Sequence, residues 1–234
     1  MSDVEPPRAM QFAVRVEKLE PPDVVDVFTA AARGVIAVLD NHRSLPGGEW
    51  HEEVAAWNGA RIRKIVRRAR GAAWDRAQSI PGTTVVHGSA AVRAFVPGLI
   101  AEAPPALAKL QIQSTPLEEP TLFETLPVSS PVGVFGDRQP MLTIGLHPGV
   151  DMSWGKRAAQ VAHAAQRCWE RMDRGERLDW NAGGRHVDVV LPAAPLWDKY
   201  FANASVQIRD GGFTEVAPGT NTAAAFLRNV TVDA

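Results

Sequence analysis

Two segments of the chain carry side chains that could do chemistry together. The first opens a helix with three polar side chains at spacings of four and three: Lys156, Gln160 and His163. Residues at these spacings share one helical face, so all three can point into a single site. The second segment, residues 209–222, places an acid and threonine hydroxyls between glycines and prolines, among them Asp210, Thr214 and Thr222. Turn-rich segments of this kind leave polar groups available to a substrate.

These residue types suit the hydrolysis of an ester by water. Such a reaction needs a group that orients or deprotonates the water and a donor for the developing oxyanion. Asp210, which we expect at a strand end, could serve the first role. Lys156 adds a full positive charge to the N-terminus of its helix, a favourable place for an oxyanion or a phosphate. Taken singly, such residues are usually structural, and it is their joint occurrence that indicates a site.

The composition is that of a globular protein. The chain has 234 residues, 45% of them hydrophobic and 22% charged, enough for one large domain or two small ones. A net charge of −1 argues against a protein that coats nucleic acid. The single cysteine, Cys168, excludes an intrachain disulfide, and its place within a helix favours a buried thiol over a nucleophile. With no signal pattern and no long apolar run, we expect a soluble cytoplasmic protein.

Positive charge is nevertheless concentrated in one short segment. Six cations fall within ten residues: Arg61, Arg63, Lys64, Arg67, Arg68 and Arg70. Such a cluster could contact phosphates of a nucleic acid. The alternative is an ordinary solvated face.

The positions of the tryptophans indicate an internal repeat. Trp57-Asn58 recurs as Trp180-Asn181, and Trp74 recurs as Trp197, both at an offset of 123 residues. Upstream, strand 12–16 can be matched with strand 142–146, and helix 24–39 with helix 154–172. We therefore predict two similar α/β copies that pack as an intramolecular pseudo-dimer.

The two copies differ at the polar positions. Matching Ala30 with Ala158 puts Phe28 opposite Lys156, Ala32 opposite Gln160 and Val35 opposite His163. His87 falls opposite Asp210. On this alignment the first copy is a structural or substrate-handling half, and catalysis depends on the second copy alone.

The basic segment 61–70 supports two secondary structures. Its apolar residues have helical spacing, whereas the repeat predicts a strand that matches His186–Leu191. We follow the repeat.

The repeat divides the chain into a degenerate first copy over residues 1–113, a proline-rich connector over 114–140 and a second copy over 141–234. Helices and strands alternate, which predicts an α/β fold with parallel strand pairs and helices on the sheet faces. In the second copy we expect strands over 141–146, 186–191, 205–209 and 222–227, and a short helix over 195–202.

Two motifs of the second copy resemble those of the archaeal and eukaryotic type of peptidyl-tRNA hydrolase. They read MSWGKRAAQVAHA over 152–164 and DGGFTEVAPGTNT over 210–222, and the resemblance covers residues 141 to about 228. It implies a small mixed sheet with helices on both faces. It also implies hydrolysis of the ester between a peptide and the 3′ end of tRNA, with no metal or cofactor. The implied catalytic residues are Lys156, Asp210, Thr214 and Thr222, and the implied substrate-binding residues are Gln160, His163, Gly155 and Gly212.

The chain departs from the family pattern beside Thr214. Family members usually carry a basic residue and a glutamine there, where this chain has Phe213 and Glu215. Both changes weaken the attraction for a phosphate-rich substrate. Two other functions therefore stay open: a non-catalytic RNA-binding module, and an esterase or amidase that acts on a small substrate.

Overall fold

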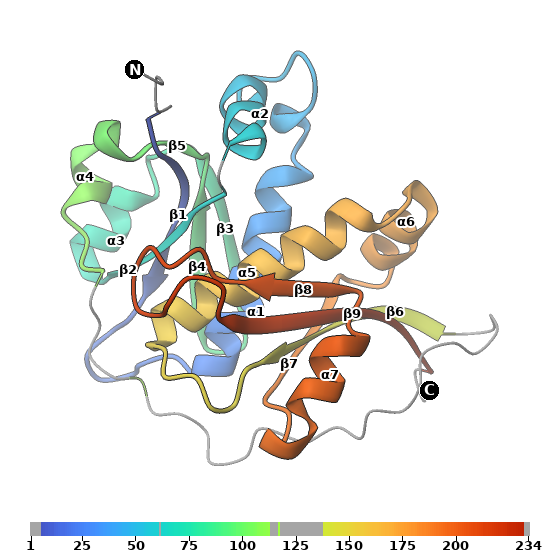
Figure 1. The fold of residues 1–234 in the computed structure, drawn as a ribbon. Helices are drawn as coiled ribbons and strands as arrows, with labels where there is room; N and C mark the ends of the chain where they lie inside the picture. The colour runs from blue at the N-terminus through green and yellow to red at the C-terminus, as the bar shows by residue number, and fades with distance from the viewer. Residues whose placement is uncertain (1–5, 61, 113–116, 118–137, 232–234) are drawn as a thin grey trace, which may run out of the picture.

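Two mixed β-sheets, each packed with helices, form an α/β protein (Figure 1). The computed structural model describes residues 6–60, 62–112, 117 and 138–231. The first sheet contains β1 (Arg8–Arg15), β2 (Lys64–Ala69), β3 (Gly82–His87), β4 (Ala90–Phe95) and β5 (Gly98–Leu99). The second contains β6 (Arg138–Leu146), β7 (His186–Val190), β8 (Val206–Arg209) and β9 (Asn221–Thr231).

Strand order and direction are the same in both copies. The first sheet runs β2-β1-β4-β3, with β5 beside β1, and the second runs β7-β6-β9-β8. In each sheet the leading strand pairs in parallel with the next strand of the chain: β1 with β2, and β6 with β7. On its other side the leading strand pairs antiparallel with β4 or β9. That strand in turn pairs antiparallel with β3 or β8. Two similar α/β copies are therefore confirmed, whereas the prediction of parallel pairings holds for one strand pair in each sheet.

Three helices of the first copy recur in the second, and a fourth, short one does not. The helices are α1 (Val24–Leu39), α2 (His51–Gly59), α3 (Gly71–Ala77), α4 (Pro105–Ala108), α5 (Trp154–Arg171), α6 (Arg174–Ala182) and α7 (Trp197–Asn203). Short 3₁₀ turns occupy His42–Ser44, Ile100–Glu102 and Ala194–Leu196. Helices α2 and α6 lie at the predicted offset of 123 residues, as do α3 and α7 to within a turn.

The repeated tryptophans make the same contact in each copy. Trp57 is fully buried and donates from Nε1 to the Arg63 carbonyl at 3.2 Å, and Trp180 donates to the His186 carbonyl at 3.0 Å. Each indole thereby fixes the chain at the start of a strand, β2 or β7. This shared hydrogen bond explains why both tryptophans sit at the same offset.

The sequence alignment was wrong by two residues upstream of the tryptophans. Met10 pairs with Lys64 in one copy, and Leu142 pairs with Val187 in the other. Since Lys64 and Val187 lie 123 residues apart, Met10 rather than Phe12 corresponds to Leu142. The gap in the alignment lies in loops, whose length the tryptophans do not constrain.

The helix alignment needs the same correction. The side chains of Asp23 and Ser153 cap α1 and α5 by accepting from the backbone N–H groups of the first turn. Counting from these caps puts Asp26, and not Phe28, opposite Lys156. Likewise Ala30 stands opposite Gln160, and Arg33 stands opposite His163.

Two further expectations concern residues 61–70 and the connector. The strand β2 confirms the repeat-based prediction, and the helical alternative is wrong. The predicted connector extends too far, because residues 138–140 belong to β6. Most of the connector lies outside the described residues, as does Arg61.

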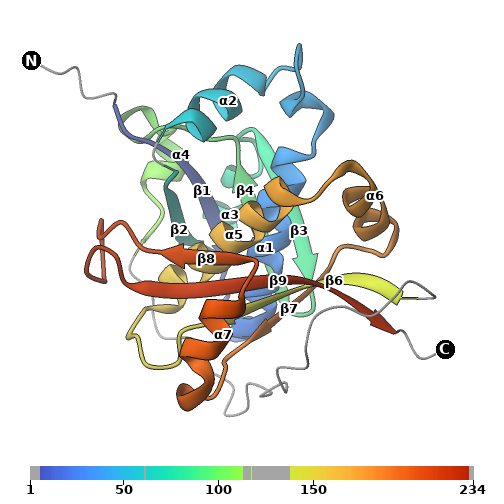
Figure 2. The same ribbon diagram turned by 45° about the vertical axis from the view of Figure 1, so that its right-hand side comes forward.

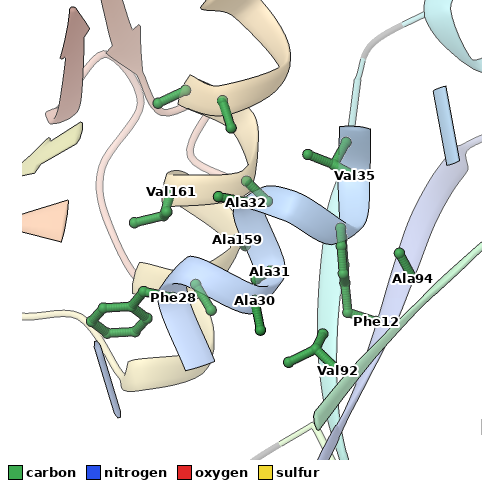
Figure 3. Close-up of a cluster of buried hydrophobic side chains, with 14 of the residues drawn as sticks. Phe12, Phe28, Ala30, Ala31, Ala32, Val35, Val92, Ala94, Ala159 and Val161 are labelled. Atoms are coloured by element: carbon green, nitrogen blue, oxygen red, sulfur yellow. The ribbon is translucent and has the colours of Figure 1, made fainter. Parts of the chain in front are cut away.

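Helices α1 and α5 pack against each other between the two sheets (Figures 1 and 2). Alanines line the contact, so the helix backbones approach closely; Figure 3 shows Ala30, Ala31 and Ala32 of α1 near Ala159 and Val161 of α5. A single buried apolar cluster includes residues of both copies. The copies therefore share one core, which holds their facing surfaces in a fixed relation. None of the described helices is long and apolar enough to cross a membrane.

Candidate functional site

The first turn of α5 is tied to the loop between β8 and β9. Ser153 caps the helix by accepting from the Lys156 N–H at 3.2 Å. The carboxylate of Glu215 accepts from both the backbone N–H and the hydroxyl of Ser153, each at 2.7 Å. Glu215, which the resemblance marks as a departure, thus holds the loop against the helix that carries Lys156.

Asp210 lies at the centre of a buried polar network. Lys156 Nζ donates to Asp210 Oδ2 at 2.5 Å, and Gln160 Nε2 donates to the same oxygen at 2.7 Å. The Gly212 N–H donates to Oδ1 at 2.8 Å. The Asp210 side chain is only 8% exposed and that of Lys156 only 10%. The pair is therefore shielded from bulk solvent except where it lines the pocket described below, and each charge depends on the other.

Thr222 lies behind this network. It is fully buried, and its hydroxyl donates to Gln160 Oε1 at 2.8 Å. That bond fixes which end of the Gln160 amide faces Asp210, because the accepting oxygen must point at Thr222. Thr222 can therefore position Gln160, although it does not line the pocket described below.

Thr214, unlike Thr222, lies at the surface of the protein. It is exposed, and its Oγ1 accepts from Lys156 Nζ at 3.0 Å. An ammonium group can only donate, so the hydroxyl proton of Thr214 is free for another acceptor. Gly212 supports this turn with φ of 74°, and a Cβ there would lie 2.3 Å from Pro218. Glycine is thus required where the loop presents its N–H to Asp210.

These groups open onto a pocket of about 290 Å³ between the two copies. The loop after β8 lies beside β2 in both Figure 1 and Figure 2. The second copy contributes Gly155, Lys156, Gln160, His163, Asp210 and Thr214 among the lining residues. The first copy contributes Ile62, Arg63, Lys64, Ile65, Val66, Ile100 and Ile112. Sequence reasoning had assigned the site to one copy, and it missed this wall because no local pattern reveals which strand faces α5.

Two basic groups in the pocket have lowered pKa values. Burial, together with Lys64, Arg167 and Lys156, holds the pKa of His163 well below 6.5, so its imidazole is neutral at pH 7. Burial also lowers the pKa of Lys64 to about 7. Lys64 donates to Gln166 Oε1 and lies over the Trp57 ring, 4.9 Å from its centroid.

The basic cluster does not form one continuous surface. Arg67 is buried and donates to Gln11 at 2.7 Å and to the Leu110 carbonyl at 2.8 Å, so it cannot reach a phosphate. Arg68 donates to the Gln111 side chain. Arg63 lines the pocket, and Arg70 is exposed outside it. The prediction of a joint phosphate surface is therefore wrong for Arg67.

The corresponding region of the first copy holds Asp26, Arg33 and His87. His87 Nε2 lies 3.9 Å from Asp26 Oδ1, and its Nδ1 lies 3.2 Å from an Arg33 nitrogen. Arg33 also donates to the Arg185 carbonyl of the second copy at 3.1 Å. An acid thus replaces Lys156 and an imidazole replaces Asp210, while Arg33 bridges the copies. The charges of the second-copy site are not reproduced.

The functional groups that meet in the site are a carboxylate, an amine and hydroxyls. Among the described residues, no group of three or more His, Cys, Asp or Glu side chains could hold a metal ion. No protein-family model matches the sequence.

Proposed function

We propose that the protein hydrolyses the ester bond between a peptide and the 3′ end of tRNA, releasing the peptide and free tRNA. The observation that carries this proposal is the Lys156–Asp210–Thr214 contact in the wall of the pocket. It unites the residues of both resembling motifs, which lie more than 50 residues apart in the chain. No catalytic nucleophile is required, because water can attack the ester directly.

Each group of the network has a role in that reaction. Asp210 accepts three hydrogen bonds, so about one of its roughly four acceptor positions remains for a water molecule. The water oxygen adds to the ester carbonyl as its proton moves towards Asp210. Lys156 and the free proton of Thr214 stabilise the oxyanion, aided by the N-terminus of α5. The intermediate then expels the ribose oxygen, which takes up the proton.

Release of free tRNA from a purified N-acetyl-aminoacyl-tRNA tests the proposal. We expect Asp210→Asn and Lys156→Met each to lower kcat by about 100-fold or more, the scale for losing an oriented charge. Thr214→Val, at an exposed position, should lower kcat by about 10-fold without unfolding the protein. His87→Ala is the matched control, because His87 holds the place of Asp210 in the first copy, and it should change kcat little.

The outcomes separate the candidates. Wild-type protein that releases no tRNA above the buffer rate contradicts the proposal, and tRNA binding without release indicates the non-catalytic module instead. Loss of activity in His87→Ala equal to that in Asp210→Asn contradicts a site centred on the second copy.

A small-substrate esterase is the second candidate, and the pocket walls favour it. Isoleucines 62, 65, 100 and 112 make one side of the pocket apolar, which suits an uncharged ester. Hydrolysis of an N-acetyl-amino acid ethyl ester with kcat/KM equal to or above that for the tRNA ester would favour this candidate.

A further inference from the structure

Arg63 lines the pocket, and no salt bridge to it forms among the described residues. It comes from the first copy, immediately before β2, and its guanidinium lies over the Phe213 ring of the second copy, 4.1 Å from the centroid. Its Nε is buried and has no hydrogen-bond partner among the described residues.

An unsatisfied buried donor indicates a missing partner. Leaving such a group without an acceptor costs about 1–3 kcal/mol, and at Arg63 the group belongs to a cation that lines a pocket. A guanidinium presents its N–H groups as a planar fork that matches two oxygens of a phosphate or carboxylate. Stacking on Phe213 fixes the plane of that fork, and Arg63 still lines the pocket. Arg63 is therefore held in place to receive an anion.

The other cation of this wall is less suited to that role. Lys64 already donates to Gln166 and lies over Trp57. Arginine, in contrast, stays charged at every pH at which the protein is folded. The unpaired positive charge of the first-copy wall thus belongs to Arg63.

The pocket also sets the size of the ligand. At about 290 Å³ it is at the lower end of the range for small-molecule sites, which fits about one nucleotide rather than a length of polymer. In a peptidyl-tRNA the scissile ester is on the terminal nucleotide, and the nearest formal charge is the 5′ phosphate of that nucleotide. We infer that Arg63, supplied by the first copy, binds the 5′ phosphate of the substrate's terminal nucleotide. This inference rests on the proposed function and makes the first copy the half that recognises the substrate.

Binding of adenosine 5′-monophosphate, with adenosine as its uncharged counterpart, tests the phosphate contact without any catalysis. By isothermal titration calorimetry we expect the wild-type protein to bind the nucleotide at least 10-fold more tightly than the nucleoside. Arg63→Gln should reduce that preference to less than 3-fold. Arg70→Gln removes a charge from the same cluster outside the pocket and should keep the preference. Phe213→Leu, which retains the charge and frees the guanidinium, should reduce it partially.

Kinetics then link the contact to the reaction. Arg63→Gln should raise KM for N-acetyl-aminoacyl-tRNA about 10-fold and lower the slope of log KM against log salt by about one. Its kcat/KM for an N-acetyl-aminoacyl-adenosine, which has no phosphate, should be unchanged.

The possible failures are distinguishable. If the wild-type protein hydrolyses both esters but shows no preference for the nucleotide, or if Arg63→Gln keeps that preference, the inference is overturned and the proposed function stands. If neither ester is hydrolysed although the preference depends on Arg63, the phosphate contact stands and the proposed reaction fails.

Discussion

The buried hydroxyl of Thr222 offers a direct test of the network behind Asp210. Thr222→Val keeps the shape of the side chain and removes the hydroxyl, which donates to the buried Gln160 Oε1 at 2.8 Å and lies 3.4 Å from the Ile208 carbonyl. An acceptor left unsatisfied at such a site costs about 1–3 kcal/mol of stability. Because the Gln160 amide is then free to turn away from Asp210, we also expect kcat to fall about 10-fold with KM unchanged.

Thr143 on β6 is a matched control for this substitution. It is 1% exposed, and its hydroxyl is buried without a hydrogen-bond partner among the described residues. Thr143→Val therefore removes an unpaired polar group, and its effect on stability should range from neutral to a gain of about 1 kcal/mol. Thr222→Ser, which keeps the donor and loses one methyl group, should cost about 1 kcal/mol and preserve kcat.

Urea unfolding followed by tryptophan fluorescence and circular dichroism measures these differences. For a protein of this size a change of 1 kcal/mol corresponds to about 2–4 °C in Tm, so thermal unfolding provides a second readout. Equal destabilisation by Thr222→Val and Thr143→Val would refute the reasoning, because the two changes would then report only on replacing a buried threonine. A drop in kcat for Thr222→Ser as large as that for Thr222→Val would refute the positioning role.

Two other predictions follow from groups with shifted pKa values. Because burial lowers the pKa of Lys64 to about 7, the unfolded chain holds its proton between pH 7 and about 10.5 while the folded protein has lost it. The free energy of unfolding of the wild type should therefore rise relative to Lys64→Met by up to about 1.4 kcal/mol per pH unit in that window, and parallel curves would contradict this. Burial raises the pKa of Cys168 to about 12. Iodoacetamide at pH 8 should therefore label the native protein at least 100-fold more slowly than the urea-unfolded chain, and equal rates would show that the thiol is accessible.

The sequence by itself determined the local elements and their repetition. Helical spacing puts Lys156, Gln160 and His163 on one face of α5, since each turn of a helix fixes the direction of side chains three and four residues apart. The tryptophan pairs identified the two copies, because each indole makes its contact with a carbonyl only six residues ahead. The alignment based on these tryptophans also correctly predicted a strand over 64–69, although the apolar residues of that segment have helical spacing. All of these features depend on residues close together in the chain.

Only the tertiary structure decided how the two copies meet. The two-residue error in the alignment shows that sheet register is set by partners far apart, as when Met10 pairs with Lys64. The burial of Arg67 and the placement of Arg63 over Phe213 follow from packing between elements, although both arginines belong to the same basic run. Arg63 and Phe213 are 150 residues apart in the chain, and they meet because α1 and α5 share one core. No local period in the sequence encodes that contact.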